Sequence, residues 1–280
     1  MQRAKYQNAF TLIELLLVMV IIGILAVSAF SFIGAGVSIY SQGVERQEAV
    51  AQARFLITRL SKELRHATPN SLRLSCDNST SGACGAQQCL EFTPFLSATH
   101  YTNYLPTVAP FNVSAVDFEL NNLTQPQAGD WATIYPLSSA DIYDEDNNKR
   151  LKISVFNSST TSAIDEWQFS KAFAQESPSK RLYLLSEPVS FCVEGQYLYR
   201  YTNYGFTVNQ LDAVSLQISS GVKRDLLGIY IANNLASDLF FTLDSLSLQR
   251  NAVLNVNAQM QFNDTEVMSF NHEVHIPNVP

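Results

Sequence analysis

Charged side chains are missing from a long stretch near the beginning of the sequence. From Leu15 to Ile39 there is no Asp, Glu, Lys, Arg or His, which makes 25 consecutive uncharged residues. About 20 such residues are enough to cross the hydrocarbon core of a bilayer as a helix. A core helix of a soluble protein is rarely so uniformly apolar, and we therefore predict that this stretch spans a membrane.

Positive charge is also scarce in the chain as a whole. There are 18 Lys and Arg residues against 25 Asp and Glu, which gives a formal net charge of −7. A nucleic-acid-binding protein needs a basic stripe that displaces counterions from phosphates, so we expect no nucleic-acid partner. Because 46% of the residues are hydrophobic, the chain can bury a core and is not an acidic disordered tail.

The short motifs that mark common enzymes are absent too. The sequence has no Gly-rich phosphate loop, no Gly-x-Ser-x-Gly turn and no plausible catalytic triad. The segment His272-Glu273-Val274-His275 has the wrong spacing for a metalloprotease helix and falls in a predicted strand. We therefore predict that the chain is not an enzyme and uses no cofactor.

The charges that flank the uncharged stretch indicate its orientation. Arg3 and Lys5 precede it, and the first 13 residues contain no Asp or Glu. Positively charged flanks stay in the cytoplasm, so everything after Ile39 is predicted to be exported from the inner membrane into the periplasm.

All four cysteines follow the predicted membrane span, on the side where disulfides persist. Cys76, Cys84, Cys89 and Cys192 allow three pairings. We favour Cys76–Cys84, which would close a polar loop, and Cys89–Cys192, which would join two predicted strands.

The residues just before the apolar stretch carry an unusual acid. Glu14 lies at the mouth of the predicted membrane helix, where burying a carboxylate costs roughly 2.5–3.5 kcal/mol and less near the interface. A carboxylate that is so costly to bury needs a partner. An ordinary secretory signal would place its cleavage site after the apolar stretch, so the alternative is a plain signal anchor with a chance Glu at its edge.

The segment Phe10-Thr11-Leu12-Ile13-Glu14, followed by an apolar helix, resembles the class III signal of type IV pilins and type II secretion pseudopilins. The resemblance implies that a prepilin peptidase and N-methyltransferase cuts between Ala9 and Phe10 and methylates the new Phe10 amine. Ala9 stands where the family usually has Gly. Glu14 would meet the Phe10 amine of a neighbouring subunit and set the axial register between subunits, because opposite charges attract strongly in a low dielectric.

The same resemblance implies partners and a place in a filament. The partners would be other minor and major pilins and the inner-membrane assembly platform. Since subunits at the extreme tip tend to lack this Glu, Glu14 implies a position beneath another subunit. The size of the exported part and the closing segment 274–280 resemble the larger minor pilins of the mannose-sensitive haemagglutinin (MSHA) pilus, the MshO type, with the J class of type II secretion pseudopilins as a relative.

The chain is predicted to be an α+β protein with four consecutive parts. Residues 1–9 form the cleaved leader, and 10–40 form the transmembrane or filament-core helix. Residues 41–68 continue it as an amphipathic helix, in which Val44, Ala51, Phe55, Ile57, Leu60 and Leu64 recur near helical spacing. Residues 69–280 form one β-rich exported domain, which closes with a hairpin of alternating strands at 254–262 and 268–276.

Two further candidate sites have simpler alternatives. Asp144, Asp146 and Asn148 resemble the start of a calcium loop, but Lys149 stands where the loop needs Gly and no Glu closes it, so a solvated turn is favoured. Tyr197, Tyr199, Tyr201 and Tyr204 could form a carbohydrate-binding patch, although such an alternating run is more often one face of a sheet.

The sequence thus predicts a minor pilin that helps to initiate and assemble a type IV, MSHA-like pilus near its tip. A type II secretion pseudopilin and a tip adhesin that binds a surface ligand are the alternatives. A membrane-anchored exported enzyme is the third alternative.

Overall fold

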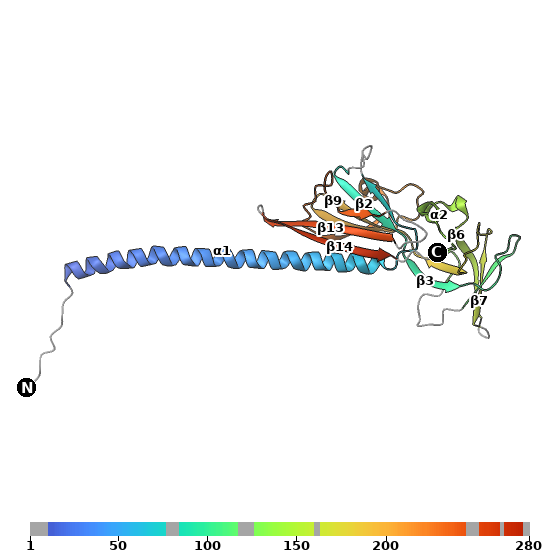
Figure 1. The fold of residues 1–280 in the computed structure, drawn as a ribbon, viewed down its shortest axis with the longest axis horizontal. Coiled ribbons are helices and arrows are strands. Elements are labelled where there is room, and N and C mark those ends of the chain that lie inside the picture. The colour runs from blue at the N-terminus through green and yellow to red at the C-terminus, as the bar shows by residue number, and fades with distance from the viewer. Residues whose placement is uncertain are drawn as a thin grey trace, which may run out of the picture. The chain divides into compact units, whose positions relative to one another are not determined.

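The computed structural model describes residues 11–76, 84–116, 126–159, 163–244, 252–263 and 266–276. Helix α1 (Leu12–Leu64) is followed by a β-rich part with two short helices, α2 (Ser139–Tyr143) and α3 (Ala213–Ile218), and three antiparallel sheets (Figure 1). This arrangement confirms the predicted fold class. The chain divides into two compact units, Met1–Val50 and Ala51–Pro280.

Every strand among the described residues belongs to the second unit. The five-stranded sheet has the order β1 (Arg73–Cys76), β2 (Gln87–Phe92), β9 (Val189–Glu194), β10 (Tyr197–Thr202) and β11 (Lys223–Gly228). The three-stranded sheet consists of β12 (Phe241–Leu243), β13 (Ala252–Asn263) and β14 (Glu266–Ile276). The six-stranded sheet has the order β3 (Phe95–His100), β8 (Arg181–Leu185), β5 (Trp131–Thr133), β6 (Arg150–Asn157), β7 (Ile164–Phe169) and β4 (Phe111–Val116).

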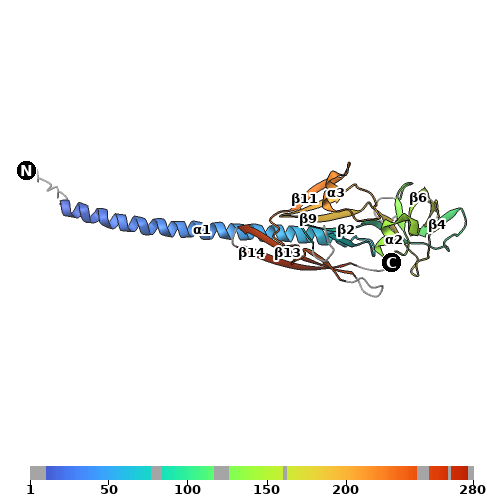
Figure 2. The same ribbon diagram turned by 90° about the horizontal axis from the view of Figure 1, so that it is seen from above.

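The last turns of α1 form the centre of the main core. Leu56, Leu60 and Leu64 recur at four-residue spacing, are almost fully buried and pack with residues of both the five-stranded and the three-stranded sheet. Figure 2 shows the last part of α1 running between β9 and β13. The predicted apolar face was partly wrong, because Phe55 is 57% exposed. The buried stripe instead passes through Ala49, Ala53 and Leu56, at spacings of four and three residues.

The predicted C-terminal hairpin is present, with every second residue of β13 facing the core. Leu254, Val256, Ala258 and Met260 are buried, and Val274 and Ile276 are buried on β14. The two strands pair from Ala252 with Ile276 to Asn263 with Glu266. The sequence pattern predicted this alternation, in which every second residue of a strand is buried on one face of the sheet.

The six-stranded sheet curls toward closure. An isolated bridge joins Tyr101, just after β3, to Ala115 of β4 at the other end of the strand order, and the Thr102 amide donates to the Ser114 carbonyl at 2.8 Å. Its inner face encloses a separate core that includes Leu151, Trp167 and Leu184. The unit therefore has two main cores, one around α1 and one inside the curled sheet.

Gly228, the last residue of β11, lies close against Leu56 of α1. A Cβ atom at this position would lie 2.6 Å from Leu56 Cδ1. Because Leu56 is almost fully buried, its side chain has little room to move away. We expect Gly228→Ala to lower the free energy of unfolding by about 1–3 kcal/mol, measured by urea denaturation. Gly43→Ala controls for loss of a glycine, since its Cβ would meet no atom within 4 Å and its φ does not lie in the left-handed region.

Candidate functional site

Helix α1 begins with a cap that brings Thr11 and Glu14 together. The Glu14 amide donates to Thr11 Oγ1 at 3.3 Å and to the Thr11 carbonyl at 3.1 Å. Thr11 is therefore the N-cap and Glu14 stands at the third helical position, the spacing of a capping box. A carboxylate in the first turn also interacts favourably with the helix dipole. Sequence reasoning missed this local role, although the Thr-x-x-Glu spacing announces it.

The helix that follows the cap is apolar enough to cross a membrane. By length and composition α1 qualifies as a candidate span, and its most apolar 18-residue window has a mean hydropathy of 2.8. Many large apolar side chains along it are exposed in the single chain, and for Leu12, Phe30 and Phe32 the exposed fraction is 75–83%. Such a surface is unfavourable in water and favourable in lipid or against apolar helices of other subunits.

The predicted cleavage site lies outside the described residues. This applies to the leader, to Ala9 and to Phe10, whereas Thr11 and Glu14 belong to the described part. The structure thus shows how the capped helix presents Glu14 at its beginning, and the processing of Ala9–Phe10 stays a prediction.

Residues 4–30 match the family model of the prokaryotic N-terminal methylation motif. This match, together with the apolar helix and the β-rich part, supports a type IV pilin-like or pseudopilin-like class of protein. The motif implies processing by a prepilin peptidase and assembly with other pilins, and it suggests a structural, non-enzymatic role. No curated protein and no solved structure matches the chain. The finer likeness to minor pilins of the MSHA pilus therefore stays a prediction.

Both disulfides have the pairing that the sequence favoured. Cys89 and Cys192 are directly opposed on β2 and β9 and form a disulfide, and both are almost fully buried. Cys76, the last residue of β1, is bonded to Cys84. The second bridge closes the segment 77–83, which lies outside the described residues.

The weak calcium candidate is organised as a turn. Asp144 caps a 3-10 turn (Glu145–Asn147) by accepting from the Asp146 amide at 3.0 Å, and Asn148 ends the turn with a positive φ of 51°. In the parts of the chain that the structure describes, no three His, Cys, Asp or Glu side chains are grouped so that they could hold a metal ion. The geometry therefore gives these residues a capping role.

The tyrosines of the predicted patch do not form one exposed surface, because they differ in burial. Tyr197 is 45% exposed, whereas Tyr201 is fully buried. Tyr199 lies under the Arg224 guanidinium, 3.5 Å from its ring centroid. Tyr204 donates to or accepts from Ser190 Oγ at 2.8 Å. The run is thus mainly a sheet face, which was the favoured reading.

A buried ion pair, which sequence reasoning missed, connects β1 to β2. Arg73 Nε donates to Glu91 Oε2 at 2.6 Å, and the Tyr204 hydroxyl donates to Glu91 Oε1 at 3.1 Å. Glu91 has no exposed surface, and burial raises its pKa above the ordinary value while Arg73 and Tyr204 act in the opposite direction.

Arg73 also hydrogen-bonds to a loop and packs against an aromatic ring. Its two terminal nitrogens donate to the carbonyls of Thr207 and Val208 at 2.8 and 2.6 Å, and its guanidinium lies 3.5 Å from the Tyr143 ring centroid. Arg73 therefore holds together β1, β2, α2 and the loop after β10.

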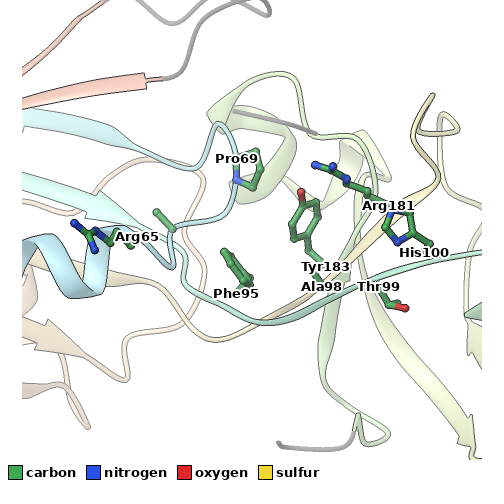
Figure 3. Close-up of a pocket in the computed structure, with 9 residues that line it drawn as sticks. Arg65, Pro69, Phe95, Ala98, Thr99, His100, Arg181 and Tyr183 are labelled. Carbon is green, nitrogen blue, oxygen red and sulfur yellow. The ribbon is translucent and has the colours of Figure 1, made fainter. Parts of the chain in front are cut away.

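A pocket of about 310 Å³ opens beside the end of α1, on the face of β3 and β8 that points away from Leu182 and Leu184 (Figure 3). Figure 3 shows the Phe95 and Tyr183 rings among the lining residues and the Arg181 guanidinium close to the Tyr183 hydroxyl. The Phe95 and Tyr183 ring centroids are 5.8 Å apart with an edge-to-face tilt. Burial raises the pKa of Tyr183, and the hydrogen bond from Arg181 opposes that rise.

Proposed function

We propose that this chain is a minor pilin that takes part in the initiation and assembly of a type IV, MSHA-like pilus, near the filament tip. In this proposal residues 1–9 are removed, residues 10–40 anchor the chain in the inner membrane and then enter the filament core, and residues 69–280 are periplasmic. Residues 41–68 connect the two.

The observation that carries the proposal is the capped apolar helix α1, whose first turn contains Glu14. The methylation motif at residues 4–30, an 18-residue window of mean hydropathy 2.8 and the exposed apolar surface occur together on α1. A carboxylate at this end of an apolar helix is costly in lipid unless a cation reaches it. The methylated amine of Phe10 on a neighbouring subunit would supply that cation.

The periplasmic location has independent support from the cysteines. Both disulfides lie after the apolar half of α1, and stable disulfides form in oxidising compartments such as the periplasm. The positive residues Arg3 and Lys5 precede the helix, which favours a cytoplasmic N-terminus.

The test separates the charge of Glu14 from its capping role. A Gln at the third helical position satisfies a capping box without carrying charge, whereas Thr11→Ala removes the cap and keeps the carboxylate. We expect Glu14→Gln to lower the number of surface pili per cell at least tenfold, the same result that we expect for an in-frame deletion. Thr11→Ala costs only about 1 kcal/mol of helix stability and should leave most pili in place.

Three controls make the count interpretable. Immunoblots must show equal amounts of each variant in the membrane, and mass spectrometry of the mature chain should find N-methyl-Phe10. If the deletion leaves the pilus count unchanged, the assembly role is wrong. Loss of attachment at a normal count would then point to an adhesin, and loss of an exported cargo to a pseudopilin. If Glu14→Gln assembles normally while Thr11→Ala does not, Glu14 acts only as a cap.

A further inference from the structure

A pocket of about 480 Å³ lies where the chain passes from the five-stranded sheet to the three-stranded sheet. Gly228, at the end of β11, still pairs with Leu198 of β10. Two residues later the Tyr230 carbonyl accepts from the Gln261 amide of β13 at 2.9 Å. The volume lies within the roughly 300–1,000 Å³ that small-molecule sites occupy. We call this hollow the corner pocket, and its described lining consists of Gly195, Gln196, residues 230–233, Gln261 and Phe262.

The corner pocket has no charge in its lining. No Asp, Glu, Lys, Arg or His is among the described residues that line it. Four other hollows each have at least one such residue, namely Arg65, Arg59, Glu273 and Glu166 respectively. A charged ligand would lose hydration in the corner pocket without gaining an opposite charge, so the lining favours a neutral ligand.

Two side-chain amides in the lining are available for hydrogen bonds. Among the described residues, the side chains of Gln196 and Gln261 have no hydrogen-bond partner. Each amide offers an acceptor oxygen and a donor nitrogen. Asn233 is different, because its Nδ2 donates to the Asn257 carbonyl at 2.8 Å and its Oδ1 accepts from the Gln259 amide at 2.9 Å. Asn233 therefore fixes the wall of the pocket, and the two glutamines can bind a ligand that both donates and accepts.

Tyr230 gives the pocket an aromatic surface in an unusual backbone conformation. Its ring centroid is 4.8 Å from that of Phe262, and the residue is 37% exposed. Its φ is 66°, in the left-handed region that a bulky residue adopts only at a cost and glycine adopts freely. The passage between two sheets accounts for the turn of the backbone but not for a tyrosine, since glycine would be less strained there. Strained residues of this kind are concentrated at ligand-binding sites.

The neutral lining, the amides and the aromatic ring together favour one class of ligand. A purely apolar molecule would leave the glutamine amides without partners. A saccharide is neutral, its hydroxyl groups both donate and accept, and the C–H face of its ring packs on the negative face of an aromatic ring. We propose that the corner pocket binds a neutral saccharide, with a sugar ring packed on Tyr230 and its hydroxyl groups hydrogen-bonded to the amides of Gln196 and Gln261. A saccharide would bind here whether or not the chain enters a filament, because every lining residue belongs to the second unit.

Neutral sugars with different linkages test the class of ligand. Cellobiose, maltose and diacetylchitobiose are titrated into the full chain by calorimetry, in a zwitterionic detergent that has no sugar head group. We expect at least one of them to bind with a millimolar or lower Kd. Sorbitol, which has hydroxyl groups but no ring, should bind at least tenfold more weakly than that disaccharide. A tenfold increase in NaCl should change the Kd less than twofold, because no charge of a described residue lines the pocket.

The length of the preferred sugar distinguishes its source. The corresponding tetrasaccharide is compared with the disaccharide under the same conditions. Tighter binding of the tetrasaccharide indicates a polysaccharide, and equal binding indicates a free sugar or the end of a chain. Either result agrees with a saccharide site.

Variants place the binding in the corner pocket. Tyr230→Gly removes the ring and adopts the same φ without strain, so it should lower the affinity of the preferred sugar at least tenfold in a folded chain. Tyr230→Phe keeps the ring and should change the affinity less than threefold, whereas Gln261→Ala should lower it severalfold. Tyr104→Ala removes a tyrosine that is 82% exposed and does not line the pocket, and should change the affinity less than twofold. Circular dichroism and urea denaturation check that each variant is folded.

Several results would overturn the proposal. These are no binding of any of the three disaccharides at millimolar concentration, equally tight binding of sorbitol, or an equal loss of affinity in Tyr104→Ala. Binding of the neutral peptide acetyl-Gly-Asn-Ser-Gly-amide in place of every sugar would assign the pocket to a polypeptide instead. Because pilus counts play no part, this failure is distinguishable from failure of the assembly role.

Discussion

Arg73→Ala is expected to lower the free energy of unfolding by about 3–5 kcal/mol, because it leaves the Glu91 carboxylate buried without a cation. Glu91 has no exposed surface, and its remaining side-chain partner is the Tyr204 hydroxyl at 3.1 Å. The same change releases the Thr207 and Val208 carbonyls from the guanidinium. Urea denaturation of the full chain with its disulfides intact, followed by circular dichroism, measures the effect.

Matched variants separate the ion pair from the space that it fills. Glu91→Gln keeps a side chain of similar size and leaves Arg73 its two carbonyl partners, so its cost should be smaller than that of Arg73→Ala. The double variant Arg73→Met with Glu91→Leu removes both charges together. It should recover most of the lost stability, since apolar replacement of a buried pair is often close to neutral.

The pH dependence of Arg73→Ala follows from the pKa of Glu91. Burial raises this pKa above the ordinary value, so the folded state binds a proton more readily than the unfolded state does. The contribution of Glu91 to stability is then greatest below its unfolded pKa and falls as pH rises toward the folded pKa. Without Arg73 the folded pKa rises further, so the deficit of the variant should be larger at pH 7 than at pH 4. A deficit that does not change with pH would contradict this account of the pair.

The sequence predicted well the elements whose pattern has one dominant period. The uncharged stretch identified α1, and the alternation of apolar and polar residues in 254–262 identified β13 with its buried face. The Cys89–Cys192 pairing could be favoured because both residues lie in runs that read as strands. In each case burial follows the residue type directly.

The curled six-stranded sheet was harder to predict because polar residues face its interior. In β7 the buried positions are Asp165, Trp167 and Phe169, so the alternation begins with a charged residue. Asp165 is accommodated by the Ser159 amide, which donates to Oδ1 at 2.9 Å. On β3, Thr99 is buried and donates to the Val116 carbonyl at 2.8 Å. Such hydrogen bonds satisfy buried polar groups only after the tertiary fold has formed, and no local pattern announces them.

The candidate sites also differ in whether they depend on a contiguous motif or on the tertiary fold. Glu14 could be singled out from the sequence because the motif is contiguous and lies at the start of one helix, while its role in assembly stays a prediction. The pocket joins Arg65, Phe95 and Arg181, which are far apart in the sequence and meet only through the pairing of β3 with β8. The Arg73–Glu91 pair likewise depends on the register of β1 and β2, in which these two residues are opposed.

Removal of the Cys89–Cys192 disulfide is also expected to lower the free energy of unfolding strongly. The two residues are 103 positions apart, and the chain-entropy account assigns a loop of about 100 residues roughly 4.7 kcal/mol. Cys76 and Cys84 are only 8 positions apart, for which the same account gives about 2.5 kcal/mol. We therefore expect Cys89→Ala with Cys192→Ala to destabilise the chain by about 2 kcal/mol more than Cys76→Ala with Cys84→Ala.

Loss of packing is expected to add to the effect of loop length on the free energy of unfolding. Cys89 and Cys192 are buried in a cluster with Tyr201 and Leu216, so their truncation also removes contacts between the five-stranded sheet and α3. A comparison of the two double variants by urea denaturation, each also measured against the reduced wild-type chain, separates these contributions. When each double variant is also measured in reduced form, it lacks the same bridges as the reduced wild-type chain and differs only by two sulfur atoms, so any further loss of stability reports on packing. Equal destabilisation by the two double variants would show that neither loop length nor burial controls the contribution of these bridges.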